Sequence, residues 1–295
     1  MKKVLILGAT GMLGHAVYGV LRGKYDLILS LRNPEKLALL EKFYGENARA
    51  SRVIIFDAAQ VYRDYQQKKG APGPALESLV SQAGPVDHVV NALGVTIPFA
   101  LNDPGLTFFV NGAFPHILAG IFGEKLVHIT TDCAFSGMSG FPYDEKSPKN
   151  PPDLYGLSKS LGEPLTCLTL RTSIIGRELD GFTGLLEWFL KQKGKTLTGF
   201  ANHFWNGITT KQFGRICDKI FQDRGGVPKS GLFHVFSDPV SKYQMLLEFE
   251  KKYRLSCEIK ADRENKLNRT LSTLHPLNAW LGIPSFETML AEIEN

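Results

Sequence analysis

Short, continuously apolar segments recur through the first half of this chain, and no other feature of the sequence constrains the fold as strongly. They lie at residues 4–7, 27–31, 53–56, 88–90 and 127–129, and helix-like stretches separate most of them. Continuous hydrophobicity is typical of strands that are covered on both faces, whereas half-exposed strands alternate apolar and polar residues. Strands that alternate with helices are joined by right-handed crossovers, so the pattern predicts an α/β fold with a doubly wound parallel sheet.

The first apolar segment leads directly into a glycine-spaced loop, Gly8-Ala9-Thr10-Gly11-Met12-Leu13-Gly14, and an amphipathic helix follows. Glycines let the backbone turn tightly and approach a pyrophosphate, whose charge is met by free N–H groups at the helix start. Such a turn is weak evidence alone, but its place between the first strand and the first helix indicates a Rossmann-like dinucleotide site. The expected contacts are Gly8, Thr10, Gly11, Met12, Leu13 and Gly14.

The end of the second predicted strand indicates which dinucleotide binds. An NAD-specific site has an acidic residue there, which bonds the ribose hydroxyls. This chain instead has Ser30 and Arg32, and its nearest acid, Asp26, lies at the opposite end of the strand. A guanidinium and a hydroxyl can both bond a 2′-phosphate, so the sequence favours NADP as cofactor.

Two further loops are expected to line the cofactor site. The loop after the third predicted strand begins with Asp57 and Ala58, where Asp57 either bonds the adenine amine or caps a turn. The fourth strand ends in Asn91, Ala92 and Leu93, which suit a loop that passes beneath the nicotinamide ribose.

The domain organisation follows from where the strand-helix rhythm stops. Three later elements continue it, namely a strand at 169–173, a helix near 210–221 and a strand at 232–236. Residues 174–205 and 239–295 lack it. We therefore predict an NADP-binding Rossmann domain formed by residues 1–173 and 206–238, and a smaller C-terminal substrate-binding lobe formed by residues 174–205 and 239–295.

A tyrosine and a lysine four residues apart form the candidate catalytic pair. Reducing a carbonyl requires a hydride at one face and a proton donor at the developing alkoxide. A tyrosine can supply that proton, because a nearby ammonium lowers its pKa from about 10 toward working pH. Tyr155 and Lys159 would share one helix face. Tyr65 and Lys69 have the same spacing, but they fall in a polar stretch that we interpret as a solvated helix face.

Hydroxyl groups at the end of the fifth predicted strand favour Tyr155 over Tyr65. That strand runs into Thr130, Thr131 and Asp132. Ligands of open α/β sheets bind at the carboxyl ends of the strands. Thr131 is therefore the expected second hydrogen-bond donor to the substrate oxygen.

Taken together, these motifs resemble the extended short-chain dehydrogenase/reductase family, and within it the dTDP-4-dehydrorhamnose reductase-like branch. The resemblance is carried by Gly8–Gly14, Asn91–Gly94, Thr131–Phe135, Tyr155–Lys159, Gly162–Glu163 and Leu170–Ser173. It implies a catalytic triad in which Tyr155 donates the proton, Lys159 holds the nicotinamide ribose and Thr131 polarises the keto group. It also implies NADPH-dependent reduction of a dTDP- or UDP-linked 4-keto-6-deoxy sugar, for dTDP-rhamnose or other polysaccharide biosynthesis in the cytoplasm.

The sequence departs from the family mainly in the substrate half. Ile174 stands where the reductases usually have tryptophan, and residues 205–210 keep only the glycine and the final threonine of the Gln-x-Gly-x-Pro-Thr stretch. The region around Arg269 is altered as well. Buried core packing is as good an interpretation of Trp205 as stacking on a ligand. The candidate substrate contacts are Asp132, Cys133, Phe135, Trp205, Asn206 and Arg269.

Two other functions stay open on the sequence. One is nucleotide-sugar epimerisation, although such enzymes tend to bind NAD and Arg32 favours NADP. The other is a non-catalytic, NADP-binding regulatory subunit, a role known in this branch, although retention of Tyr155, Lys159 and Thr131 favours an enzyme. Dehydratases of the family have glutamate where this chain has Cys133, which argues against dehydration.

Composition and charge exclude several other classes. The chain has 295 residues, of which 43% are hydrophobic, but no apolar stretch of transmembrane length is expected; the nearest, residues 182–190, contains Glu187. The four cysteines are far apart, which argues against a metal site and for reduced thiols in the cytoplasm. A net charge of +5 with dispersed Lys and Arg argues against nucleic acid. No membrane partner is expected, and a homodimer stays open.

Overall fold

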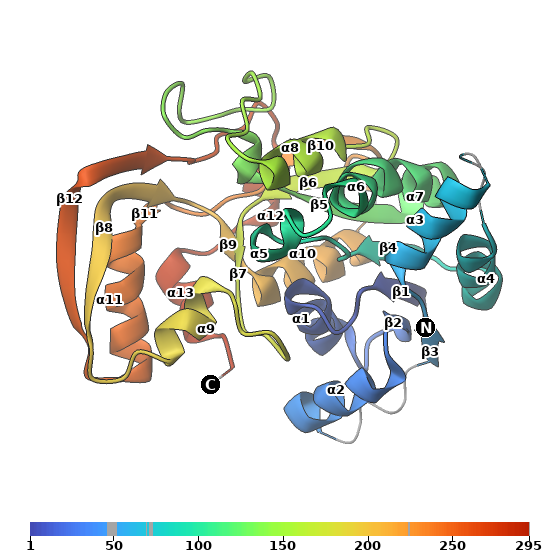
Figure 1. Cartoon of the computed structure of the whole chain (residues 1–295), viewed down its shortest axis with the longest axis horizontal. Coiled ribbons are helices and arrows are strands. Elements are labelled where there is room, and N and C mark those ends of the chain that lie inside the picture. The colour runs from blue at the N-terminus through green and yellow to red at the C-terminus, as the bar shows by residue number, and fades with distance from the viewer. Residues whose placement is uncertain (46–51, 69, 71–72, 224, 295) are drawn as a thin grey trace.

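A seven-stranded parallel sheet forms the larger part of the computed structural model, which describes residues 1–45, 52–68, 70, 73–223 and 225–294 (Figure 1). The strand order is β10-β6-β5-β4-β1-β2-β3. The strands are β1 (Lys3–Leu7), β2 (Asp26–Leu31), β3 (Arg52–Ile55), β4 (His88–Asn91), β5 (Leu126–Thr131), β6 (Leu168–Thr172) and β10 (Gly231–His234). The predicted doubly wound Rossmann-like sheet is confirmed. Its strand order reverses between β1 and β4, which is where ligands of such sheets bind.

Helices cover both faces of this sheet, as the continuous hydrophobicity of its strands predicts. In β1, Val4 and Ile6 face one apolar core, and Leu5 and Leu7 face the other. The helices on the first face include α1 (Met12–Leu21), α2 (Leu37–Tyr44) and α10 (Thr210–Gln222). Those on the second include α3 (Ala58–Gln67), α4 (Pro74–Ala83) and α7 (Phe114–Phe122). Burying one Val, Leu or Ile side chain contributes about 1.5–3 kcal/mol, so both cores stabilise the sheet.

One helical run is more apolar than the sequence analysis expected. Residues Pro104–Lys125 are continuously helical, through α6 (Pro104–Phe108), the π-helical turn η3 (Phe109–Ala113), α7 and η4 (Gly123–Lys125). By length and composition alone this run could cross a membrane, so the expectation that no stretch reaches that length was wrong. Half of the run is buried inside the protein, and the core helix of a globular protein has the same properties.

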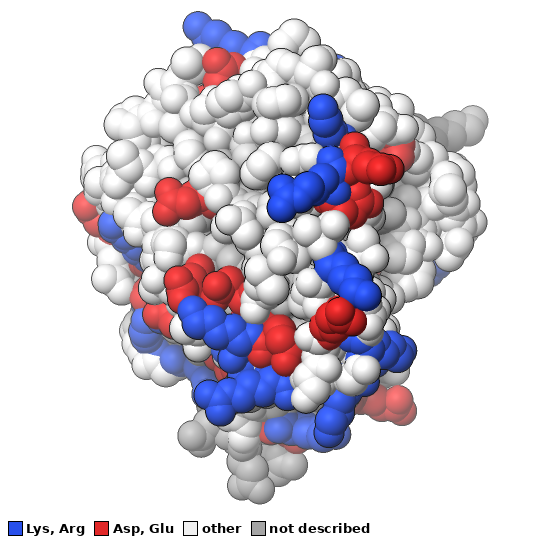
Figure 2. Space-filling model, turned by 90° about the vertical axis from the view of Figure 1, so that its left-hand side faces the viewer, with Lys and Arg blue, Asp and Glu red and all other residues white. Residues whose placement is uncertain are grey.

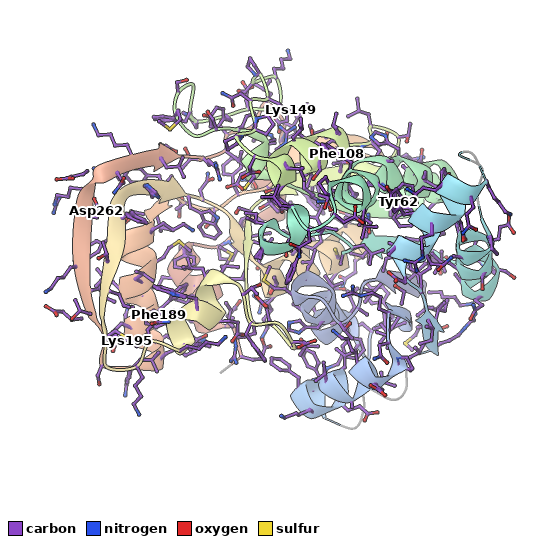
Figure 3. All side chains as sticks on the ribbon, in the orientation of Figure 1. Tyr62, Phe108, Lys149, Phe189, Lys195 and Asp262 are labelled. Carbon is purple, nitrogen blue, oxygen red and sulfur yellow. The ribbon has the colours of Figure 1, made fainter. Side chains whose placement is uncertain are left out.

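A second, smaller sheet forms the lobe at the left of Figure 1. Its order is β11-β8-β12, with β8 (Thr196–Trp205) parallel to β12 (Glu258–Asn268) and antiparallel to β11 (Val240–Ser241). The helices α9 (Leu185–Leu190), α11 (Lys242–Tyr253) and α13 (Phe286–Ala291) share an apolar core with this sheet. Phe189 of α9 is fully buried in that core, and Lys195 and Asp262 lie farther out on the lobe (Figure 3).

The two parts of the molecule meet along short connecting elements. A two-stranded sheet pairs β7 (Ile174–Ile175) with β9 (Ile208–Thr209), where the chain leaves and re-enters the larger part. Further along, α12 (Leu277–Leu281) buries both of its end leucines in the core beside α10. The division at residues 173, 206 and 238 stays a proposal.

The outer face of the lobe carries charges of both signs. Figure 2 shows Lys and Arg side chains intermixed with Asp and Glu, mostly in the lower half of this face. Several of the lobe's charged side chains form exposed ion pairs, such as Lys260 with Glu258. This face therefore presents no broad positive field of the kind that attracts nucleic acid.

Candidate active site

The glycine loop forms a close backbone cradle at the start of α1. Gly8 has φ +78°, a conformation that favours glycine. A Cβ on Gly14 would lie 2.1 Å from the Gly8 carbonyl oxygen, so Gly14 serves packing between loop and helix. Gly11 caps α1 without a side-chain hydrogen bond, and the first turn has no acidic residue. The helix N-terminus is therefore available to an anion.

A cleft runs along the carboxyl ends of the strands from this loop toward α8 (Leu154–Leu161). Its two hollows share Gly11 and residues 92–95 as a common wall. Of the predicted cofactor contacts, the following line it: Gly8, Thr10, Gly11, Met12, Leu13, Ser30, Arg32, Asp57, Ala58, Ala92, Leu93, Tyr155 and Lys159. Gly14 and Asn91 do not line it. The wall also includes residues that the sequence analysis did not single out, among them Phe56, Leu106 and Val110.

Three polar residues mark the end of this cleft at β2 and β3. Ser30 is buried, and its Oγ accepts a hydrogen bond from the Gly8 N–H at 2.9 Å. Arg32 is exposed on the rim and makes no ion pair among the described residues. The Asp57 carboxylate accepts from the Ala59 N–H at 3.0 Å and so caps α3. Asp57 thus serves as a cap in this structure.

Asn91 supports the cleft from below through a buried chain of hydrogen bonds. Its Oδ1 accepts from the Leu93 N–H at 3.2 Å, and its Nδ2 donates to His128 Nδ1 at 3.0 Å. His128 Nε2 donates to the Gly162 carbonyl at 2.9 Å, because that oxygen can only accept. Burial holds the pKa of His128 well below its usual value, so the ring stays neutral. This series of hydrogen bonds joins the loop at residues 91–95 to the end of α8.

Asn111 joins the same loop to α8 at a second point. Its Oδ1 accepts from the Val95 N–H at 2.8 Å, and its Nδ2 donates to the Val95 carbonyl at 2.9 Å and the Ser158 hydroxyl at 3.1 Å. The side chain comes from η3, where the π-helical turn interrupts the regular helix. Both links hold the cleft wall against the helix that carries the candidate catalytic pair.

Tyr155 and Lys159 lie on α8, as their spacing predicts, and both line the cleft. Asp153 caps this helix by accepting from the Gly156 N–H at 2.7 Å. Burial raises the pKa of the Tyr155 phenol, while its bond with the Thr131 hydroxyl partly lowers it. The buried Lys159 ammonium donates to the Ile129 carbonyl at 2.8 Å, and burial lowers its pKa to about 8. Near neutral pH the Tyr155 phenol therefore holds its proton, and the Lys159 ammonium one turn further along the same helix is mostly charged.

Tyr65, which also has a lysine four residues later in the sequence, lies in different surroundings. The Tyr65 ring packs against Phe109, at 5.3 Å between ring centroids, in the core beneath α3. Lys69 lies outside the described residues. Tyr65 is absent from the cleft lining, so its ring serves packing.

A buried ion pair follows α8, the helix of the candidate catalytic pair, and was not predicted to form. Glu163 accepts from Arg171 Nη2 at 2.6 Å and Nε at 2.9 Å, and from the Thr130 hydroxyl at 3.1 Å. Lys149, on the loop above α8 in Figure 3, donates to the same carboxylate at 3.1 Å. Arg171 also donates to His234 Nε2 at 2.8 Å. These neighbours hold the pKa of Glu163 below its usual value despite burial.

The polar end of β5 lies beside Tyr155. Thr131 Oγ1 accepts from the Cys133 N–H at 3.2 Å and donates to Asp132 Oδ1 at 3.3 Å. Asp132 is buried, and burial raises its pKa. Burial also raises the pKa of the Cys133 thiol, to about 12, so the sulfur stays protonated. The Thr131 hydroxyl hydrogen would have to turn from Asp132 before it could be donated to a ligand.

Three of the predicted substrate contacts serve packing instead. Phe135 is fully buried and stacks on Tyr143 at 4.2 Å between centroids. Trp205 is buried with its ring edge-on to Phe286 at 5.6 Å. Asn206 is also buried, and it donates to the Leu271 carbonyl at 2.8 Å and accepts from the Leu271 N–H at 2.9 Å. None of the three lines a hollow next to Tyr155.

The remaining substrate contacts do come together, and a lysine joins them. Arg269 Nη1 donates to the Cys133 sulfur at 3.4 Å. Lys242, at the start of α11, has its ammonium 5.5 Å from the centre of the Trp205 ring, and it attracts Asp132. Lys242 follows Ser241 in an ordinary helix-capping pattern, so no sequence motif marked it.

Lys242 also lines a largely apolar cavity of about 560 Å³ in the lobe. The cavity lies over β8 between α9 and α11, and its walls include Leu185, Trp188, Phe200, His203 and Leu246. The rings of Phe200 and His203 stack at 4.4 Å between centroids. Such a hollow can hold a flat ring, and Lys242 lies at its polar side.

Parts of this chain are similar in sequence to proteins of known name. It is 30% identical over 127 residues to the spore coat polysaccharide biosynthesis protein SpsK of Bacillus subtilis, covering 41% of this chain and 43% of that protein. It is 39% identical over 123 residues to a dTDP-4-dehydrorhamnose reductase of Burkholderia thailandensis, covering 40% of each. The matched part is thus about two fifths of these relatives' length.

Two further comparisons, one of structures and one with a family model, match nearly the whole length of this chain. The dTDP-4-dehydrorhamnose reductase of Bacillus anthracis, solved in complex with NADP, has a TM-score of 0.68 at 18% identity, covering 99% of both chains. That likeness shows the fold. The family model described as the RmlD substrate binding domain matches residues 1–270. This chain therefore belongs to the RmlD substrate-binding domain family.

Proposed function

We propose that this protein is an NADP-dependent oxidoreductase that reduces the keto group of a nucleotide-linked 4-keto-6-deoxy sugar. The observation that carries the proposal is the pair of Tyr155 and Lys159 at one end of a cleft whose other end is a glycine cradle, with the Thr131 hydroxyl beside the Tyr155 phenol. The family membership and the reductase names among the relatives support the same activity.

The cleft fits a dinucleotide on its own geometry. The backbone at Gly8 and Gly14 leaves no room for side chains, and the start of α1 has free N–H groups for a pyrophosphate. Arg32 on the rim would bond a 2′-phosphate, and Lys159 would bond the nicotinamide ribose. When bound, NADPH supplies the hydride.

The chain's own groups supply and position the proton. Burial keeps the Tyr155 phenol protonated, so it can give its proton to the oxygen of the reduced carbonyl. The Lys159 ammonium stabilises the phenolate that remains, since a buried cation acts strongly at short range. Thr131 donates a second hydrogen bond to the same oxygen and so polarises the keto group.

The lobe offers a place for the nucleotide of the substrate. The apolar cavity over β8 has aromatic walls at Trp188, Phe200 and His203, on which a base can stack. Lys242 connects this cavity with Asp132, which adjoins Thr131. A substrate that spans the cavity and the end of β5 would bring its sugar to Tyr155.

We also propose that the protein works as a cytoplasmic homodimer. All four cysteines are free, three of them buried, which suits a reducing compartment. Apolar side chains are exposed together around α5 (Ile97–Ala100) and α8, including Phe99, Leu101, Leu157 and Leu161. A second copy would cover this surface. Sedimentation equilibrium measures the state directly.

The proposed activity is tested by following NADPH oxidation with dTDP-4-keto-6-deoxyglucose generated in place, for the wild type and Tyr155→Phe. We expect turnover that falls about a thousandfold in the variant, because the proton donor is lost. Tyr65→Phe is the matched control and should keep full activity. Tight NADPH binding without turnover by the wild type would reject this substrate and favour the regulatory-subunit function.

A further inference from the structure

We infer that His15 is a positioning residue that ties the helix behind the glycine loop to the substrate lobe, through the segment that joins β7 to α9. We call this segment, residues 176–184, the strap. Figure 1 shows it as a yellow loop that extends from β7 toward α1 and α2 before it returns to α9. The inference rests on the proposed function for its choice of cofactor. It gives a role to a buried histidine that the proton transfer at Tyr155 does not use.

His15 connects three segments of the chain through the two nitrogens of its ring. It follows Gly14 directly and lies in the first turn of α1, with its side chain buried. Its Nε2 donates to the Arg177 carbonyl at 2.8 Å, because that oxygen can only accept. Its Nδ1 lies 2.9 Å from the hydroxyl of Tyr44, the last residue of α2. Burial lowers the pKa of His15, which favours the neutral ring, so Nδ1 can accept the Tyr44 hydrogen.

The strap also packs on the cofactor end of the molecule beyond its bond with His15. Leu179 is buried in the apolar core that contains α1 and packs against α2. Asp180 pairs with Lys36 at 2.7 Å, but the Asp180 side chain is exposed, and such pairs are weak. A Cβ on Gly184 would lie 3.8 Å from Met12 Sδ, so the end of the strap contacts the glycine loop. The strap thus touches the cofactor loop as well as the helix behind it.

The other end of the strap is tied to α9 through a buried carboxylate. Glu187 lies on α9, and its Oε1 accepts from Arg177 Nε at 2.8 Å and from the Glu178 N–H at 2.9 Å. The Glu178 carboxylate in turn accepts two backbone N–H groups near the end of the strap. The same helix carries Trp188, which lines the lobe cavity. A continuous path of polar contacts therefore runs from α1 through Arg177 to a wall of that cavity.

Because these contacts are largely out of water, we expect α1 and the strap to open together. Separating them would leave the His15 N–H and the Arg177 carbonyl without partners, which is costly. A ligand that binds only the closed form stabilises every part that must open with its site. NADPH at the start of α1 would therefore stabilise the strap and, through Glu187, α9. Packing of Leu179 alone is the competing explanation, and it does not depend on the hydrogen bonds of His15.

The test is hydrogen-exchange mass spectrometry of the full-length protein with and without NADPH, in wild type, His15→Leu and His15→Gln. NADPH at 100 times its Kd can slow openings that abolish its binding by up to about 100-fold. We expect exchange in the strap and α9 to slow at least about tenfold in the wild type and not at all in His15→Leu. His15→Gln should restore the slowing, because its amide can donate to Arg177 and accept from Tyr44. His275→Leu, at an exposed histidine, is the matched control and should behave as the wild type.

A second variant breaks the path at the lobe end and keeps the test decisive if His15→Leu does not fold. Glu187→Gln should keep the slowing at residues 177–179 and lose it in α9, whereas Asp180→Asn, which breaks only the exposed pair, should change neither.

Three results would overturn the inference: equal slowing in wild type and His15→Leu, slowing confined to the glycine loop in the wild type, or a His15→Gln variant that behaves like His15→Leu. The measurement needs cofactor binding but no turnover. NADPH binding without turnover would reject the reductase and leave this inference standing, whereas a wild type that does not bind NADPH would reject both.

Discussion

The two ends of the active-site cleft are built in different ways. At the cofactor end, the contacts come from backbone turns that follow individual strands, such as the loop from Gly8 to Gly14. At the substrate end, the polar groups come from the turn after β5, from the residue that follows β12 and from the start of α11, which are distant in the sequence. A turn is encoded by residues next to one another, whereas a cluster of side chains depends on how the whole lobe packs. The difference explains why one end can be recognised from motifs and the other cannot.

The largest expected effect concerns the buried ion pair between Glu163 and Arg171. Glu163→Gln keeps the shape of the side chain but leaves the buried Arg171 guanidinium without its counter-charge. Breaking a buried ion pair in this way costs about 3–5 kcal/mol, which denaturant unfolding can measure. Glu258→Gln removes a surface charge and should leave the free energy of unfolding unchanged. A loss below about 1 kcal/mol for Glu163→Gln would show that the pair contributes little to stability.

The next effect tests the backbone construction of the cofactor end. Gly14→Ala places a methyl group 2.1 Å from the Gly8 carbonyl oxygen, so the loop must move. We expect a loss of roughly 2–3 kcal/mol in unfolding free energy and a parallel loss of NADPH affinity. Gly120→Ala is the matched control, because a Cβ there meets nothing within 4 Å in a helix. That control should be neutral or stabilising, since alanine favours helix.

The third effect is a pH dependence of stability that comes from Lys159. The folded-state pKa of Lys159 is about 8, below the value near 10.4 in an unfolded chain. Between these values the unfolded state holds more protons, so stability rises with pH. Relative to Lys159→Met, the wild type should gain roughly 2 kcal/mol between pH 7 and pH 9.5. Parallel pH profiles for the two proteins, measured by urea unfolding, would contradict a buried ammonium.

These differences match what the sequence could and could not predict. The strands, their parallel order and the candidate catalytic pair followed from local patterns, and the structure has Tyr155 and Lys159 on one helix as expected. The packing roles of Phe135 and Trp205 did not follow, because an aromatic residue beside a motif suits a core and a ligand site equally. Lys242 gave no signal, since only the packing of α11 brings it near Asp132.

His128 and Arg171 show the same limit inside the better-predicted half. Both lie in buried strands of the parallel sheet, in segments that the sequence identifies as strands, but their partners come from other segments of the chain, both earlier and later. Hydrophobic periodicity detects burial and says nothing about which polar group a buried side chain will meet. Buried polar residues within predicted strands are therefore the signal that could have pointed to these networks.

A smaller effect is expected for the contact between Asn206 and the segment that follows β12. Asn206→Ala removes both hydrogen bonds to the backbone of Leu271 and leaves its N–H and C=O unpaired. We expect a loss of about 1–2 kcal/mol in unfolding free energy, with NADPH affinity unchanged. Fluorescence titration with NADPH alongside urea unfolding measures both. A large fall in NADPH affinity would show that the lobe and the cofactor end are coupled more tightly than their construction implies.

The smallest effect concerns a single rim charge at the cofactor end. Arg32 is exposed, and Asp180, the acid whose pKa it helps to lower, is already paired with Lys36 at 2.7 Å. Ser30 is neutral and its oxygen accepts from the Gly8 N–H, so we expect Arg32 to supply the charge that distinguishes NADPH from NADH. Arg32→Gln should weaken the binding of NADPH about tenfold, or roughly 1 kcal/mol, and leave the binding of NADH unchanged. Equal weakening of both cofactors would instead mean that Arg32 holds the loop in shape, and selectivity would then have to come from the backbone.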